Sequence, residues 1–171
     1  MASASSTGVV SDAASPSGFR LAISGILLVF YLGVVLAATM WPTPLDASYE
    51  STITRLLDIL HRHGVPEWFG YGRLEFSANV AMFVPLGFLL ALTLAQRAWW
   101  AVLLLIPAFS GLIEYAQGQW LAARFASGWD VVANTLGGYV GAVLAYLVRA
   151  VVHARDRLVI AQALAGNRHR Y

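Results

Sequence analysis

Residues 129–148 read WDVVANTLGGYVGAVLAYLV, a stretch whose only charged side chain is Asp130 near its start. A helix of about 20 mostly apolar residues crosses a bilayer, so this stretch predicts a membrane span. Three comparable stretches precede it, at residues 21–40, 76–95 and 99–121. The chain is 58% hydrophobic and 12% charged, which is far more apolar than a soluble domain of 171 residues needs to be. The sequence therefore predicts an all-α, four-transmembrane-helix antiparallel bundle.

The remaining segments are more polar. Residues 1–18 are mostly Ser, Ala, Gly and Thr, which bury too little apolar surface to order a chain, and they predict a flexible N-terminal tail. Residues 19–148 form the predicted membrane domain, and residues 149–171 a charged cytoplasmic C-terminal tail. Between the first two spans, apolar residues recur at helical spacing opposite charged ones: Ile53, Leu56, Leu57 and Leu60 against Arg55, Asp58 and Arg62. This pattern predicts a short amphipathic helix in the membrane interface.

Tryptophan and arginine positions indicate how the spans sit in the membrane. The tryptophans all lie at or just outside predicted span ends, where their amphipathic rings favour the interface: Trp41, Trp68, Trp99, Trp100, Trp120 and Trp129. The arginines near the spans divide into Arg20, Arg97, Arg149, Arg155 and Arg157 on one side and Arg55, Arg62, Arg73 and Arg124 on the other. Because cytoplasmic loops carry the excess of positive charge, we expect a multi-pass protein of the cytoplasmic membrane with both termini in the cytoplasm.

Charge and cysteine content argue against several classes of function. A formal net charge of +2, from scattered residues, is too small to indicate nucleic-acid binding. The absence of cysteine excludes disulfides and thiolate metal sites. His61 and His63 are two residues apart, so they do not share a helical face, and no carboxylate completes an obvious metal site with them. We expect no metal, no cofactor and no nucleic-acid partner.

The polar residues of the spans gather at one end of the predicted bundle. Antiparallel spans alternate in direction, so the start of the second span, the end of the third and the start of the fourth lie in the same leaflet, which is the outer one if the termini are cytoplasmic. The candidate site residues there are Asn79, Glu114, Gln117, Arg124, Asp130 and Asn134. A charged side chain facing lipid costs roughly 2.5 to 3.5 kcal/mol, so Glu114 should face inward, either paired or protonated. Arg124 could pair with Glu114 or Asp130.

Small residues suggest how these helices pack. The third span carries a small and polar stripe of Pro107, Ser110, Gly111, Glu114, Gln117 and Gly118, and the fourth carries Asp130, Asn134, Gly137, Gly138, Gly141 and Ala145. We expect the two stripes to face each other, because small residues let backbones approach closely. The candidate packing residues are Pro85, Gly87, Gly111, Gly137, Gly138 and Gly141, with Pro85 predicted to kink the second span. Asp130 could equally start a helix by stabilising its positive end.

The same residues form an ordered set of motifs. Asn79 is followed by FVPLG at residues 83–87, by Glu114-x-x-Gln117, by Arg124, and by DVVANTLGGxxG from Asp130 to Gly141. This set resembles the VanZ-like family of small bacterial membrane proteins over residues 20–148. The resemblance implies a helical membrane protein whose prototype is an accessory factor in low-level resistance to teicoplanin, a lipid-tailed glycopeptide antibiotic. It attaches no catalytic role to any matching residue.

Three functions are compatible with the sequence. In the first, which we favour, the polar residues around Arg124 bind an anionic lipid headgroup or an amphiphilic glycopeptide without catalysis, and so affect envelope properties or antibiotic tolerance. In the second, an intramembrane enzyme acts on a lipid-linked cell-envelope substrate with Glu114 as general acid or base. In the third, the polar residues only join helices in a structural scaffold. Membrane lipids and a lipid-linked envelope precursor or lipoglycopeptide are the expected partners, and the oligomeric state is left open. Binding is favoured because so many polar groups in one leaflet exceed what docking two helices needs.

Overall fold

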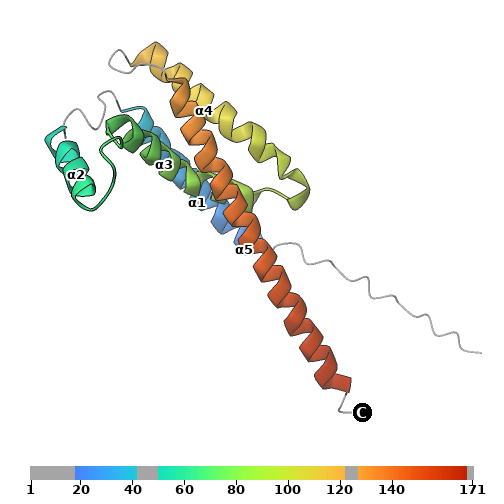
Figure 1. Cartoon of the computed structure of the whole chain (residues 1–171). Coiled ribbons are helices and arrows are strands. Elements are labelled where there is room, and N and C mark those ends of the chain that lie inside the picture. Colours follow the sequence, from blue (N-terminus) through green and yellow to red (C-terminus); the bar gives the residue numbers. More distant parts are fainter. Residues whose placement is uncertain (1–17, 42–49, 122–126, 169–171) are drawn as a thin grey trace, which may run out of the picture.

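The computed structural model describes residues 18–41, 50–121 and 127–168, and within these ranges it is mostly helical (Figure 1). Its helices in chain order are α1 (Gly18–Thr39), α2 (Glu50–Arg62), α3 (Tyr71–Thr93), the 3-10 turn η1 (Gln96–Ala98), α4 (Trp100–Trp120) and α5 (Gly128–Arg168). Helices α1, α3, α4 and α5 are long and apolar enough to cross a membrane. The described ranges contain no strand, and the predicted all-α fold with four spans is confirmed.

Two helices extend beyond the predicted spans. Helix α3 begins at Tyr71, ahead of the predicted start at residue 76, and α5 has 41 residues and continues through residues 149–168. That segment contains no proline and is rich in Ala and Arg, which are good helix formers, so the helix continues where hydropathy falls. At about 1.5 Å per residue α5 is about 60 Å long, twice the roughly 30 Å of a bilayer core. Its C-terminal part accordingly projects past the other helices (Figure 1).

Helices α3 and α5 form the central pair of the bundle. A Cβ atom added to Gly137 would lie 2.1 Å from Val80 O, and one added to Gly141 would lie 1.9 Å from Val84 O. An added Cβ at Gly87 would lie 1.9 Å from the backbone oxygen of Gly138. The two backbones are therefore so close that only glycine fits at these positions.

This contact corrects one part of the predicted packing. Gly137 and Gly141 were expected to meet the third span, which is α4, but they pack against α3. Gly138 does face α4, since its added Cβ would lie 2.5 Å from Ile106 Cγ2. Gly111 has open space around it and makes no close approach. Successive residues of a helix face directions about 100° apart, so Gly137 packs against α3 while Gly138 packs against α4.

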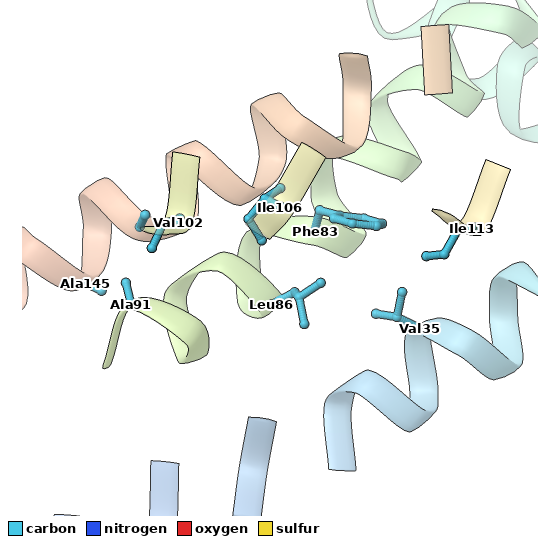
Figure 2. Packing of buried hydrophobic residues seen from close by; sticks show 9 residues of the cluster. Val35, Phe83, Leu86, Ala91, Val102, Ile106, Ile113 and Ala145 are labelled. Atoms are coloured by element: carbon cyan, nitrogen blue, oxygen red, sulfur yellow. The ribbon is translucent and has the colours of Figure 1, made fainter. Parts of the chain in front are cut away.

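The apolar core lies where α1, α3, α4 and α5 meet (Figure 2). Its buried members include Val35 of α1, Phe83, Leu86 and Ala91 of α3, Val102, Ile106 and Ile113 of α4, and Ala145 of α5. The ring of Phe83 lies 6.3 Å from that of Phe109, centroid to centroid, in a tilted arrangement. Large apolar side chains also cover the outside, as at Leu104 and Leu112 of α4, which are 61% and 66% exposed. An apolar exterior of this kind fits a lipid environment.

Tyrosine hydroxyls satisfy backbone carbonyls beside the two helical prolines. Pro107 has no N–H to donate to Leu103 O, and the hydroxyl of Tyr139 donates to that oxygen over 2.8 Å. Pro85 lies inside α3, and the hydroxyl of Tyr31 donates to the nearby Met82 O over 2.9 Å. The bond to Leu103 O matters in a bilayer because lipid cannot satisfy a freed carbonyl, whereas Met82 O lies three residues before Pro85 and is not the carbonyl that this proline frees.

Arg149 performs a similar task at the opposite end of the bundle from the candidate site. Its NH2 group donates to Leu92 O over 2.7 Å and to Leu94 O over 3.1 Å. These carbonyls belong to the C-terminal end of α3, where helical donors run out. One side chain of α5 thus supplies the hydrogen-bond donors for the last carbonyls of α3.

Helix α2 is the short helix expected between the first two spans, and it lies beside the bundle (Figure 1). It ends in a left-handed glycine, Gly64 with φ +95°, and Val65 N donates back to Leu60 O over 3.0 Å. This is the usual glycine-terminated helix end. His61 Nε2 lies 3.1 Å from Phe69 O, so the following connection folds back on the helix.

Candidate functional site

The end of α1, the start of α3, the end of α4 and the start of α5 lie at the same end of the bundle (Figure 1). One side-chain hydrogen bond there joins α3 to α5: Asn79 Nδ2 donates to Asp130 Oδ1 over 3.0 Å. Both side chains are half-buried. Asp130 also stands in the first turn of α5, where a negative charge stabilises the helix.

Glu114 lies inside the bundle near the C-terminal end of α4. It is 8% exposed, and its Oε1 accepts a hydrogen bond from the backbone N–H of Ser127. Ser127 directly precedes α5, and its Oγ lies 3.3 Å from Trp129 N and its carbonyl oxygen 3.0 Å from Asp130 N. The Glu114 carboxylate is thus held at the N-terminus of α5, where the helix dipole favours a negative charge.

Gln117 connects the same end of α4 to α1. Its side chain is buried, and Nε2 donates to the backbone oxygen of Thr39 over 2.8 Å. The Thr39 hydroxyl in turn donates to Val35 O over 2.8 Å. No side-chain pattern in the sequence predicted that α1 takes part, because the acceptor is a backbone carbonyl at a helix end. The only signal for a contact with α1 was Thr39, a polar residue at the end of an otherwise apolar span.

Asn134 and Ser110 form an inner layer of the cluster. Asn134 is 3% exposed, and its Nδ2 donates to Ser110 Oγ over 2.9 Å, joining α5 to α4. Its other amide atom, Oδ1, is buried and has no hydrogen-bond partner within the described ranges. Buried polar atoms are nearly always bonded to protein or to water. Two hydroxyls of α5, Thr135 Oγ1 and Tyr146 OH, are likewise buried without a partner among the described residues.

Arg124 lies outside the described residues, so its pairing with Glu114 or Asp130 stays a prediction. The other five candidate residues are brought together at one end: Asn79, Glu114, Gln117, Asp130 and Asn134. Among the described residues, no group of His, Cys, Asp and Glu side chains is arranged to hold a metal ion. His61 and His63 bond to different backbone oxygens, those of Phe69 and Ile59.

A family model described as VanZ/LLP1 matches residues 28–149, which is more than half of the chain. The chain belongs to the VanZ/LLP1 family. All six candidate site residues lie within the matched range, as do the glycines between α3 and α5. The projecting part of α5 after residue 149 lies outside it. No curated protein and no solved structure matches the chain.

The site of this VanZ/LLP1 protein is built of acceptors and amides held in fixed directions. Two carboxylates, Glu114 and Asp130, are each oriented by a donor on another part of the chain. Three further residues were not among the predicted site residues, although each is hydrogen-bonded to one of those residues: Ser110 to Asn134, Ser127 to Glu114 and Thr39 to Gln117. Such an arrangement can bind a polar group with directional hydrogen bonds, and it can also join helices.

Proposed function

We propose that this VanZ/LLP1 membrane protein binds the polar headgroup of an amphiphile, an anionic lipid or a lipid-tailed glycopeptide, where α3, α4 and α5 meet. Through that binding it affects envelope properties or tolerance of amphiphilic antibiotics. The proposal is supported by the convergence of Asn79, Glu114 and Asp130 at a helix end, close to the depth at which headgroups lie.

The observation that carries the proposal is the buried Oδ1 atom of Asn134. A cluster that served only to join helices would satisfy its own acceptors, because an unpaired buried carbonyl costs about 1–3 kcal/mol. Asn134 is almost fully buried, yet Oδ1 has no partner among the described residues. We expect a protein to retain an unpaired buried acceptor of this cost where the acceptor binds a ligand.

The test uses full-length protein purified in detergent and native mass spectrometry of bound phosphatidylglycerol, phosphatidylcholine and teicoplanin. Glu114→Gln and Arg124→Ala are expected to weaken binding of the preferred amphiphile by roughly tenfold, the size of one charge-assisted hydrogen bond. Tyr146→Phe is the control. It removes a buried hydroxyl that has no partner among the described residues and that lies farther along α5. Equal binding of all three amphiphiles by wild type and variants would show the proposal to be wrong.

Catalysis is a second candidate function, favoured by the buried and oriented carboxylate of Glu114. In this alternative the protein is an intramembrane enzyme acting on a lipid-linked cell-envelope substrate, and Glu114 transfers a proton. Glu114→Gln keeps the side-chain shape and removes the proton-transferring group. An unchanged profile of lipids and peptidoglycan precursors in cells expressing that variant would argue against catalysis.

A structural scaffold is a third candidate, favoured by the bonds that join two helices each, such as Asn134 to Ser110 and Gln117 to Thr39. In that case Glu114→Gln lowers thermal stability in detergent, and any loss of function follows the loss of folded protein. Comparing stability with phenotype for the same variants separates this role from the other two.

A further inference from the structure

Three uncharged polar side chains lie on the faces where α4 and α5 meet: Ser110 of α4 and the adjacent residues Asn134 and Thr135 of α5. Asn134 Nδ2 donates to Ser110 Oγ over 2.9 Å, so these two residues bridge the helices. Thr135 shares a helical face with Tyr139, one turn farther along α5, and the Tyr139 hydroxyl bonds to a backbone oxygen of α4. Thr135 therefore also lies on the α4 side of α5. We call Ser110, Asn134 and Thr135 the inner site.

Two atoms of the inner site, Asn134 Oδ1 and Thr135 Oγ1, have no hydrogen-bond partner in the part of the chain that the structure describes. Both atoms are buried, and Asn134 as a whole is 3% exposed. A third buried atom of this kind, Tyr146 OH, lies about 18 Å from Asn134 along the axis of α5. Among the described residues, the inner site thus brings two such atoms onto neighbouring positions.

The hydroxyl of Thr135 differs from those of two other helical threonines. Thr39 Oγ1 donates to Val35 O over 2.8 Å, and Thr93 Oγ1 donates to Leu90 O over 2.8 Å. A threonine in a helix is commonly satisfied in this way, by a carbonyl of its own preceding turn. Thr135 makes no such bond. Its hydroxyl is therefore available to a group outside α5.

The inner site is closed on the side of the bundle centre. Gly138, one turn farther along α5, packs against Ile106, one turn before Ser110: a Cβ atom added to the glycine would lie 2.5 Å from Ile106 Cγ2. Ile106 itself is 1% exposed. On the other side, the first turn of α5 at Asp130 lies about 6 Å away along the helix axis. A polar group therefore reaches the inner site from the polar end of the bundle.

The chemistry of the inner site suits a hydroxyl group. Asn134 Oδ1 can only accept a hydrogen bond, whereas Thr135 Oγ1 can donate as well as accept. A hydroxyl brings one O–H donor and two acceptor lone pairs, so it can bond to both kinds of atom. It is also uncharged, and a group that lies between two helices next to a buried Ile106 then avoids the cost of burying a charge.

We propose that the inner site receives a hydroxyl group of the bound headgroup, with Asn134 Oδ1 as its acceptor and Thr135 Oγ1 as its donor. This assignment rests on the proposed function, because it assumes that an amphiphile is bound at this end of the bundle. It goes further by naming the part of the headgroup that enters between the helices. The hydroxyl belongs either to an anionic lipid, as in the glycerol headgroup of phosphatidylglycerol, or to a sugar of a glycopeptide. A phosphate of the same headgroup stays outside the inner site.

Two lipids with the same acyl chains and the same net charge test the assignment by native mass spectrometry of the full-length protein in detergent. Phosphatidylglycerol carries hydroxyl groups in its headgroup, and phosphatidylethanol carries none. We expect phosphatidylglycerol to bind roughly fivefold more tightly, as one neutral hydrogen bond would give. Binding of phosphatidylcholine is the reference, and binding of teicoplanin is measured in parallel as the second source of hydroxyl groups.

Two variants address the inner site. Asn134→Leu removes the acceptor at similar volume, and Thr135→Val removes the hydroxyl while keeping the branched side chain. Each is expected to bring the affinity for phosphatidylglycerol close to that for phosphatidylethanol and to leave the affinity for phosphatidylethanol unchanged. Tyr146→Phe is the control and should change neither affinity. Thermal unfolding of each variant is measured first, and if Asn134→Leu does not fold, Thr135→Val decides.

The possible results separate this inference from the proposed function. If phosphatidylglycerol and phosphatidylethanol bind equally, both more tightly than phosphatidylcholine, and neither variant weakens teicoplanin binding, the hydroxyl assignment is wrong and amphiphile binding stands. A preference for phosphatidylglycerol that both variants retain would also overturn the assignment. Weaker binding of teicoplanin in both variants, with the two anionic lipids bound equally, would assign the inner site to a sugar hydroxyl. If neither anionic lipid binds better than phosphatidylcholine and teicoplanin does not bind, the assignment and the proposed function both fail.

Discussion

The hydroxyl of Tyr139 on α5 donates a hydrogen bond of 2.8 Å to Leu103 O on α4, the carbonyl that Pro107 leaves without its helical donor. Tyr139→Phe therefore exposes an unsatisfied carbonyl to apolar surroundings and should lower the free energy of unfolding by about 1–3 kcal/mol. Denaturant titration in detergent measures this loss. In a Pro107→Ala background the residue 107 N–H can bond to Leu103 O, so the same change should cost less. Equal losses in the two backgrounds would contradict this explanation.

Glycine at the α3–α5 contact gives a second prediction. A Cβ at residue 141 would lie 1.9 Å from Val84 O and 2.7 Å from Phe88 N, so Gly141→Ala forces the helices apart. We expect a loss of about 3 kcal/mol or a failure to fold. Gly111→Ala is the control, because nothing lies within 4 Å of its added Cβ, and alanine in a helix interior should raise stability by about 0.5–1 kcal/mol. A similar response at both positions would mean that α3 and α5 are not in close contact.

The sequence predicted the number of helices, and the reason is physical. A span must be long and apolar, and its backbone must bond internally, so hydropathy alone identifies α1, α3, α4 and α5. Alternating direction then places Asn79, Glu114 and Asp130 at one end. That grouping needs no knowledge of which helices touch.

Helix pairing and bond partners could not be predicted in the same way. The 3.6-residue period identifies a small-residue face on α5, but it does not say whether α3 or α4 covers Gly137 and Gly141. Gln117 bonds to the backbone of Thr39, an acceptor that every residue type offers and no side-chain pattern reveals. The length of α5 was missed because residues 149–168 lose hydropathy while keeping helix-forming composition.

The bond between Asn79 and Asp130 gives a third prediction, because it joins α3 to α5 over 3.0 Å. Asn79→Ala and Asp130→Ala should each destabilise the protein, and the double variant should lose less than the sum of the two. We expect a coupling energy of about 1 kcal/mol from a double-mutant cycle in detergent. Losses that simply add would show that the two side chains do not act on each other.

Arg149 gives the last prediction, at the opposite end of the bundle. Its NH2 group bonds to Leu92 O at 2.7 Å and Leu94 O at 3.1 Å, so it closes the end of α3 where the chain turns towards α4. Arg149→Met keeps the aliphatic bulk and removes both charge-assisted bonds, and it should lower stability by about 2 kcal/mol.

Loss of these bonds also has a local consequence, because the carbonyls at the end of α3 are then left to water or lipid. Hydrogen exchange should increase at the α3 terminus and η1 (Gln96–Ala98) in Arg149→Met, and the polar end around Glu114 should keep its protection. Arg155→Met is the control, since Arg155 lies exposed on the projecting part of α5. If the two arginine variants are equally stable, the end of α3 is held by its own turn, and the contact with Arg149 contributes little to the fold.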